Sequence, residues 1–187
     1  IDLLSRAGGN GYGIELTVSN AEVDHNWFQG GSYGIVHWGA EHRSNWKIHH
    51  NTFYGLDSYW PGDIIRAQQG GIHQVKLYNN TVEMIGNSTI NFVGLHGGPS
   101  DNVEIKNNLI INSSSNNRWF PNQLVFMENG ATLSGLTVSN NLLDKLPLGN
   151  VSGTYSNNKL ISAQVTKSGN RPSPYYVPAA GSPLIDA

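Results

Sequence analysis

The sequence of 187 residues contains no cysteine, few charged residues and no long hydrophobic run. Without cysteine, the chain has no disulfide, no thiol nucleophile and no cysteine-ligated metal. Its 11 basic and 13 acidic residues give a formal net charge of −2, which provides no basic footprint for nucleic acid. The absence of a run of about eighteen apolar residues excludes a helical membrane span. The length fits one domain with a substantial core.

Helical periodicity is also absent, because no window of about ten residues keeps apolar positions at helical spacing. Charged residues make up only 13% of the chain, whereas glycine alone accounts for 22 positions. Turns built from Asn, Ser, Thr and Gly suit a surface of stacked coils. Short strands punctuated by glycine remain, and we therefore expect an all-β domain.

An asparagine recurs in one local frame along the chain. An apolar residue lies three positions before it and another lies two positions after it, as in 23–28 and 48–53. The six asparagines are Asn26, Asn51, Asn80, Asn108, Asn141 and Asn158. Successive members are 25, 29, 28, 33 and 17 residues apart. A period of about 20 to 50 residues indicates a solenoid of stacked units.

The frame describes a strand that enters a bend and leaves it again. Asparagine tolerates the left-handed backbone region that a sharp corner demands. Its amide both donates and accepts, so asparagines stacked in successive coils would form hydrogen bonds along the axis. Each coil leaves its strand edges and apolar face open until the next coil covers them, which explains the repetition.

A second strand frame lies between the asparagines, with alternating apolar positions and many β-branched residues. Its members are 13–16, 34–38, 63–67, 89–93 and 123–127. With both frames, the chain resembles the right-handed parallel β-helix proteins of the pectate-lyase-like superfamily. The resemblance implies a right-handed solenoid, in agreement with the usual hand of parallel crossovers. We expect about six coils over 1–160 and an irregular segment, 161–187, that caps the open end.

Both ends of the sequence indicate a fragment of a longer, exported protein. Ile1 falls in what reads as the middle of a coil, and no signal peptide is visible. Residues 180–187, AGSPLIDA, resemble a closure common in extracellular β-helix proteins. The resemblance implies an extracellular or cell-surface location, and we expect a monomer or one part of a larger chain.

Two long insertions, 55–62 and 113–122, each contain a tryptophan followed closely by a proline. Both precede a member of the second strand frame, so we expect them near one edge of the same face. Extra loop length in a solenoid often marks the functional face. We predict that Tyr59, Trp60 and Trp119 wall a groove there.

An alignment of the second frames predicts which side chains face outward. The residues assigned to the interior are Ile14, Ile35, Ile65, Ile90 and Leu124. The first outward row is then Glu15, Val36, Arg66, Asn91 and Val125. The next outward row is Thr17, Trp38, Gln68, Val93 and Met127. In this alignment Arg66 and Gln68 stand on an exposed face beside Trp38.

An exposed tryptophan beside arginine and amide side chains is a common arrangement for holding a sugar. The aromatic face stacks on the C–H-rich ring, and the polar side chains bind hydroxyls or a carboxylate. We therefore predict Trp38, Gln68 and Asn91 as substrate-binding residues. The alternative is that the aromatic side chains only cover the sheet or plug loop ends.

Two of the seven histidines are candidates for proton transfer. His42 and His96 each lie just past the second frame of their coil, where either would act as general acid or base. The competing interpretation is a turn histidine hydrogen-bonded to the backbone. The histidine spacings do not fit a zinc site, so we expect no metal there.

The acidic residues are not clustered in the sequence, although most glycosidases require two neighbouring carboxylates. A calcium site would need several acids on adjacent coils, and only Glu41 with Asp57 or Asp63 offers one. We therefore expect no cofactor, with calcium as the open alternative.

A local stretch resembles polysaccharide lyase family 6. The residues EHRS at 41–44 lead to NTF at 51–53, and IRAQQG follows at 65–70. The resemblance implies that Arg66 matches the arginine of that family. His42 or Arg43 then stands in place of its lysine, with His42 as the base of uronate β-elimination. The acidic calcium ligands of the family have no counterpart here.

Two functions of different classes follow. The first is a secreted carbohydrate-active β-helix, a polysaccharide lyase or glycoside hydrolase. Arg66 would neutralise charge in it, while His42 or His96 moves the proton. The second is a non-catalytic segment of an adhesin or sugar-binding surface protein, which the scarcity of catalytic motifs favours. Both predict a polysaccharide partner, and the argument for carbohydrate is fold analogy.

Overall fold

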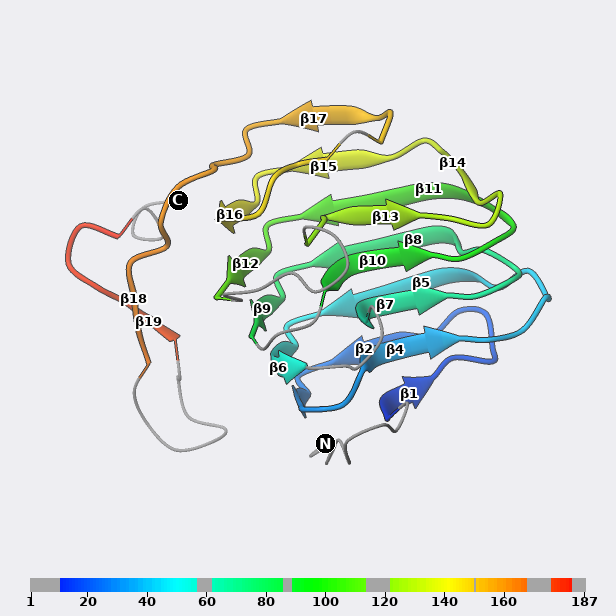
Figure 1. Ribbon diagram of the computed structural model, residues 1–187, viewed down its shortest axis with the longest axis horizontal. Coiled ribbons are helices and arrows are strands. Elements are labelled where there is room, and N and C mark those ends of the chain that lie inside the picture. The colour runs from blue at the N-terminus through cyan, green and yellow to red at the C-terminus, as the bar shows by residue number, and fades with distance from the viewer. Residues whose placement is uncertain are drawn as a thin grey trace.

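The computed structural model describes residues 11–56, 62–85, 89–113, 122–149, 151–167 and 176–182. Within these ranges the regular structure is entirely strand, and no helix is present. Consequently the described part of the chain offers no helix of the length and apolar character needed to cross a membrane. Parallel strands stack in three sheets that form the walls of a coil (Figure 1). The chain is an all-β parallel solenoid.

Each sheet takes one strand from each successive turn of the chain. The first sheet is β1 (Tyr12–Glu15), β4 (Tyr33–His37), β7 (Gly62–Ala67), β10 (Ile90–Leu95) and β13 (Val125–Met127). The second sheet is β2 (Glu22–Asp24), β5 (Ser44–His49), β8 (His73–Tyr78), β11 (Pro99–Lys106), β15 (Thr137–Ser139) and β17 (Thr154–Ser156), with β14 (Thr132–Ser134) also on β11. The third sheet is β3 (Trp27–Gln29), β6 (Thr52–Leu56), β9 (Thr81–Met84), β12 (Leu109–Asn112) and β16 (Leu142–Asp144).

Three successive turns are flanked by a hydrogen-bonded turn on both sides in all three sheets. These turns are β4 to β6, β7 to β9 and β10 to β12. Every one of these pairings is parallel, as expected for stacked coils. The right-handed sense and the count of six coils remain predictions.

The core runs along the axis between the three sheets. Its side chains are aliphatic and aromatic residues, most of them from the strands. Phe28 and Phe53 occupy the same position in successive turns of the third sheet, and their rings stack with centroids 4.6 Å apart. Full burial of each such side chain stabilises the fold by about 1.5 to 3 kcal/mol.

The recurring asparagines form a continuous ladder at the corner between the second and third sheets. In the centre of the ladder, Oδ1 of Asn80 accepts from the backbone N–H and the side-chain amide of Asn51, at 3.1 and 3.2 Å. The amide of Asn80 donates in turn to Oδ1 of Asn108 and to the carbonyl of Ile48. The same pattern continues through Asn141. The predicted stacking of asparagines is confirmed.

The left-handed corner belongs to a different residue from the one predicted. The residue before each ladder asparagine, not the asparagine itself, has a φ between 53° and 55°. These residues are His25, His50, Asn79, Asn107, Asn140 and Asn157. Two neighbouring residues therefore form the corner. The first adopts the left-handed backbone conformation, and the asparagine after it forms hydrogen bonds with the buried backbone groups at the turn.

The C-terminal segment packs beside the third sheet. Ala163 lies in a small apolar cluster with Leu109, Ile111 and Leu142. The antiparallel pair β18 (Val165–Lys167) and β19 (Tyr176–Pro178) follows. Three side chains of different segments meet the fully buried carboxylate of Glu83, namely Ser113, Lys167 and Tyr176. The proposed capping role of 161–187 remains a prediction.

Candidate functional site

The register of the first sheet decides which residues share its outer face. Glu15 pairs with Val36 and Val36 pairs with Arg66, which confirms the predicted register of these three residues, although Val36 is fully buried rather than exposed. Gly34, one position before Ile35, faces inward, because a Cβ built there would meet the ring of Phe53.

The next two coils do not have the predicted register. Ile65 pairs with Val93 rather than with Ile90, and Val93 pairs with Val125 rather than with Leu124. Val93 and Val125 are therefore buried in the core instead of facing outward.

The same correction applies to Met127, which was expected to face outward and packs against the core. One physical reason is that Ile64 and Ile65 both lie in the core cluster, so that strict alternation fails within β7. Asn91 shifts accordingly: it pairs with Asp63 and not with Arg66.

The corrected register assembles an ionic cluster on the outer face. Nη1 of Arg66 donates to Oδ2 of Asp63 at 2.7 Å. Nε2 of His96 lies 2.8 Å from the same oxygen, and Nδ1 of His96 contacts Oε1 of Glu128. The Asp63 side chain is fully buried, that of His96 is 2% exposed, and that of Glu128 is 42% exposed. Glu128 is therefore the member of the cluster that meets solvent.

The imidazole of His96 has a suitable partner in two protonation states. An imidazolium would donate to Glu128 from Nδ1 and to Asp63 from Nε2. With only Nδ1 protonated, Nε2 would instead accept from Nη1 of Arg66, 2.9 Å away. Both ring nitrogens of His96 therefore lie within hydrogen-bond distance of a partner in the cluster.

The outward row predicted that Arg66 stands free in water. Instead, neighbouring side chains hold it from several directions. Its side chain is only 11% exposed. Its Nε donates to Oε1 of Gln68 at 2.9 Å, and its guanidinium lies over the rings of Tyr33 and Trp38, 4.8 and 5.6 Å from their centroids. Burial raises the pKa of the Tyr33 phenol, against the opposing effect of the Arg66 charge. Among the described residues, Nη2 of Arg66 has no hydrogen-bond partner.

Two further residues shape the inner side of the cluster. The amide of Asn91 donates to Oδ1 of Asp63 at 2.9 Å, while its own buried Oδ1 has no hydrogen-bond partner in the described part of the chain. Gly94 pairs with Arg66 on the neighbouring strand, and a Cβ at this position would collide with the Asp63 carboxylate. Glycine is required there because the ion pair occupies the space of a side chain.

The outer residues of the site occupy one row immediately after the strands. Backbone hydrogen bonds continue the pairing beyond β4, β7, β10 and β13. This pairing aligns Trp38, Gln68, His96 and Glu128. Five predicted site residues thus meet as one group, namely Arg66, His96, Gln68, Trp38 and Asn91.

Neither Glu128 nor the central position of Asp63 is among the residues predicted from the sequence. Glu128 follows the strand 125–127 just as His96 follows 90–95, so this positional equivalence would have identified it. The signal was hidden because the alignment of these two coils was wrong.

His42 belongs to a separate chain of polar contacts at the start of the second sheet. Its Nδ1 lies 2.9 Å from Nε2 of His73, whose Nδ1 lies 2.6 Å from Oδ2 of Asp101. The hydrogen bond from His73 lowers the pKa of the Asp101 carboxyl. None of these contacts joins His42 to Arg66.

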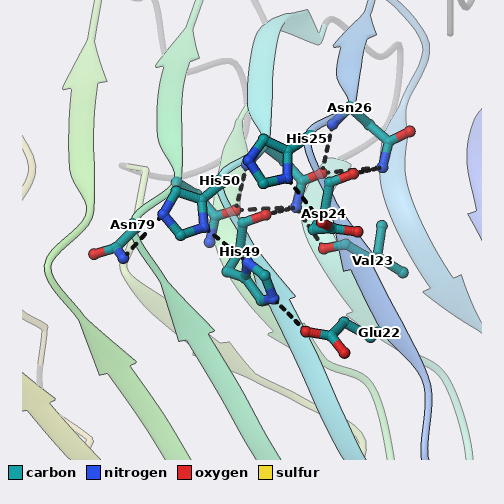
Figure 2. Close-up of polar contacts among 10 residues, drawn as sticks. Glu22, Val23, Asp24, His25, Asn26, His49, His50 and Asn79 are labelled. Carbon is teal, nitrogen blue, oxygen red and sulfur yellow. Dashed lines mark hydrogen bonds and ion pairs between the residues drawn. The ribbon is translucent and has the colours of Figure 1, made fainter.

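A third histidine group lies at the asparagine corner (Figure 2). The rings of His25 and His50 stack with an interplanar angle of 3°. Nε2 of His49 contacts Oε1 of Glu22 at 2.7 Å, and His25 pairs with Asp24. The hydrogen bond from His25 lowers the pKa of the Asp24 carboxyl. These contacts support the corner on which the ladder is built.

Several predicted residues lie outside the described ranges, namely Tyr59, Trp60, Trp119 and Asp57. Of the suggested calcium ligands, Asp63 is engaged by Arg66, His96 and Asn91. Within the described ranges, no group of three or more histidine and acidic residues is arranged to hold a metal ion.

Comparison with protein-family models, with curated proteins and with solved structures found no match. Function therefore has to be argued from the chemistry of the cluster itself.

Proposed function

We propose that this chain is an extracellular, carbohydrate-active β-solenoid that cleaves a polysaccharide by acid–base catalysis at the end of the first sheet. The observation that carries the proposal is the Asp63–His96–Glu128 chain anchored by Arg66. A carboxylate that faces solvent and is backed by an imidazole with a second carboxylate behind it is equipped to accept and return a proton.

The role of each residue follows from its exposure. Glu128 is the catalytic residue, because its side chain is the solvent-exposed member of the Asp63–His96–Glu128 series. His96 and Asp63 are positioning residues, because they are buried and act through Glu128. Nη2 of Arg66 would donate to a substrate oxygen, while Trp38 offers a ring for stacking and Gln68 an amide for hydroxyls.

The charge of the cluster bears on the substrate. Arg66 already faces the carboxylate of Asp63, so it does not present an uncompensated positive charge to a uronate. A substrate carboxylate would also meet Glu128. We therefore propose a neutral polysaccharide, in preference to the uronate that the lyase resemblance implies.

A non-catalytic role is supported by one specific observation. Asp63, Arg66 and His96 satisfy one another, so the cluster could also serve as a buried polar tie between β7 and β10. In that case the outer face would bind glycan without cleaving it, as in an adhesin or sugar-binding surface protein.

The test is incubation of the purified chain with neutral and uronate polysaccharides. New reducing ends report cleavage of any kind, and ultraviolet absorbance of unsaturated ends reports β-elimination alone. We expect reducing ends without unsaturated ends, and a loss of about 100-fold or more in Glu128→Gln. Glu15→Gln is the matched control, since it changes a carboxylate on the same sheet at β1. His96→Gln should shift the pH profile as well as the rate.

Each contrary outcome identifies which part of the proposal fails. Cleavage that survives in Glu128→Gln would remove the assigned site. Unsaturated products would show that the reaction is elimination. Glycan binding without any cleavage would establish the non-catalytic alternative.

A further inference from the structure

A second polar surface lies on the outer face of the second sheet, separate from the cluster on the first sheet. An open groove of about 570 Å³ crosses its strands there. The lining residues are Asn45, Gln74, Lys76, Asn102, Val103, Glu104, Gly135 and Thr137. This volume lies within the range of small-molecule sites, about 300 to 1,000 Å³.

The side chains of the groove come from two rows that run along the solenoid axis. One row consists of residues with left-handed backbone within or beside strands of the second sheet, namely Asn45, Gln74, Asn102 and Gly135, with φ values of 60°, 54°, 53° and 66°. The other row consists of strand residues in direct register, Lys76, Glu104 and Thr137. Neighbouring strands are about 4.8 Å apart, so the four lining strands β5, β8, β11 and β15 span roughly 14 Å.

Two amide side chains of the first row are fixed by hydrogen bonds to neighbours. Nδ2 of Asn45 donates to Oδ1 of Asn20 at 2.8 Å. Nδ2 of Asn102 donates to Oδ1 of Asp101 at 2.7 Å. In both, the amide nitrogen is engaged and the carbonyl oxygen remains as an acceptor.

Gly135 keeps the end of the groove open. A Cβ at this position would lie 2.9 Å from Oδ1 of Asn102, so any larger residue would crowd that acceptor. Other lining side chains also have hydrogen-bonding groups that are available to a ligand. Among the described residues, the side chains of Gln74, Lys76 and Glu104 have no hydrogen-bond partner.

We infer that this groove binds a neutral oligosaccharide of about three sugar rings, aligned with the solenoid axis. The lining carries one cation and one anion, so its net charge favours an uncharged ligand. It supplies donors and acceptors on closely spaced strands, which suits a ligand with many hydroxyls. The lining contains no aromatic residue, so recognition is by hydrogen bonds rather than by stacking.

The groove does not depend on catalysis at the first sheet. A chain that cleaves nothing would still bind sugar here, and a chain that cleaves could do so without this groove. Binding, rather than turnover, is therefore the measurement that tests it.

The experiment is calorimetric titration of the purified chain with cellotriose, xylotriose and mannotriose, with trigalacturonate as the charged comparison. We expect binding of at least one neutral trisaccharide and weaker binding of the trigalacturonate. The double variant Gln74→Ala/Asn102→Ala should weaken binding about tenfold or more, since it removes two hydrogen-bonding groups. Thr137→Trp should also weaken it, by filling the groove.

Lys47→Ala is the matched control. Lys47 pairs with Lys76 on the same exposed face but lies outside the groove, so this variant should bind as the parent chain does. The inference is overturned if no neutral trisaccharide binds, if trigalacturonate binds more tightly, or if the groove variants bind as well as Lys47→Ala. Circular dichroism and the unfolding midpoint of each variant establish that the fold is intact.

Discussion

Two corners of the solenoid use polar side chains in opposite ways. At the corner between the second and third sheets, asparagine repeats in turn after turn, and each copy makes the same hydrogen bonds. At the end of the first sheet, the equivalent positions hold Trp38, Gln68, His96 and Glu128, which are all different. The asparagine ladder itself is made of uncharged amides, whereas the end of the first sheet gathers charges of both signs.

This difference helps to distinguish polar residues with a structural role from those with a functional role in a stacked fold. A group that must satisfy the same backbone atoms in each coil is best served by the same residue each time, so repetition indicates structure. Different residues at the equivalent position of successive coils cannot all satisfy the same backbone groups. Such residues are therefore explained by their contacts with one another or with a ligand, and this makes the row beyond the first sheet the better functional candidate.

The largest effect is expected from breaking the ladder at its centre. Asn80→Ala removes the acceptor of two Asn51 donors and the donor to the carbonyl of Ile48, all of them buried. Since each buried unsatisfied group costs about 1 to 3 kcal/mol, we expect a loss of roughly 4 kcal/mol in the free energy of unfolding. Urea denaturation of parent and variant measures it.

Asn79→Ala is the control for this variant, because it changes the adjacent asparagine, whose side chain is exposed. Its cost should be limited to the left-handed backbone of residue 79 and one exposed contact with Nε2 of His50, about 1 kcal/mol in total. Equal losses in the two variants would show that the ladder contributes no more than the turn.

The second effect comes from the ion pair of the first sheet. Arg66→Met leaves the fully buried Asp63 carboxylate without its arginine, and we expect a loss of about 3 kcal/mol. The double variant Asp63→Asn/Arg66→Met removes both charges and should recover at least half of that loss. The same denaturation series gives both values.

Cleavage of polysaccharide sharpens this comparison. If the cluster is functional, the double variant regains stability but not activity, because Glu128 loses the buried pair that anchors His96. If stability and activity return together, the cluster is only a structural tie and the contrast between the two corners fails.

Much of the fold could be predicted because it rests on repetition. The asparagine frame identified the ladder, and the second frame located β1, β4, β7, β10 and β13 within a few residues. Both are local patterns, so they can be read without knowing how far each coil extends.

The site could be predicted only in part, because it depends on register between coils. Arg66, Gln68 and Trp38 come from adjacent turns that were aligned correctly, and they do meet. Placing His96 on Asp63 requires the pairing of Ile65 with Val93, and placing Glu128 on His96 requires that of Val93 with Val125. Coils of unequal length and the break in alternation at Ile64 and Ile65 concealed both pairings.

The smallest predicted effect is a difference between the two corners in how stability depends on pH. Burial raises the pKa of Tyr33 above its ordinary value of 10.0, whereas the ladder amides do not titrate. A raised folded-state pKa means that the protonated phenol is favoured by folding, so its contribution is intact below pH 10 and is lost as the pH rises further. The parent chain should therefore lose stability above pH 10 to a greater extent than Tyr33→Phe, and the two should behave alike at neutral pH.

The measurement is the urea midpoint of parent and Tyr33→Phe at neutral pH and above pH 10, with Tyr12→Phe as control. Tyr12 lies in the same register column of the first sheet but is exposed, so its replacement should leave the alkaline loss as large as in the parent chain. If Tyr33→Phe and Tyr12→Phe lose stability equally, the phenol over Arg66 is not held neutral by its surroundings. The outer cluster would then be as insensitive to pH as the asparagine ladder in this range.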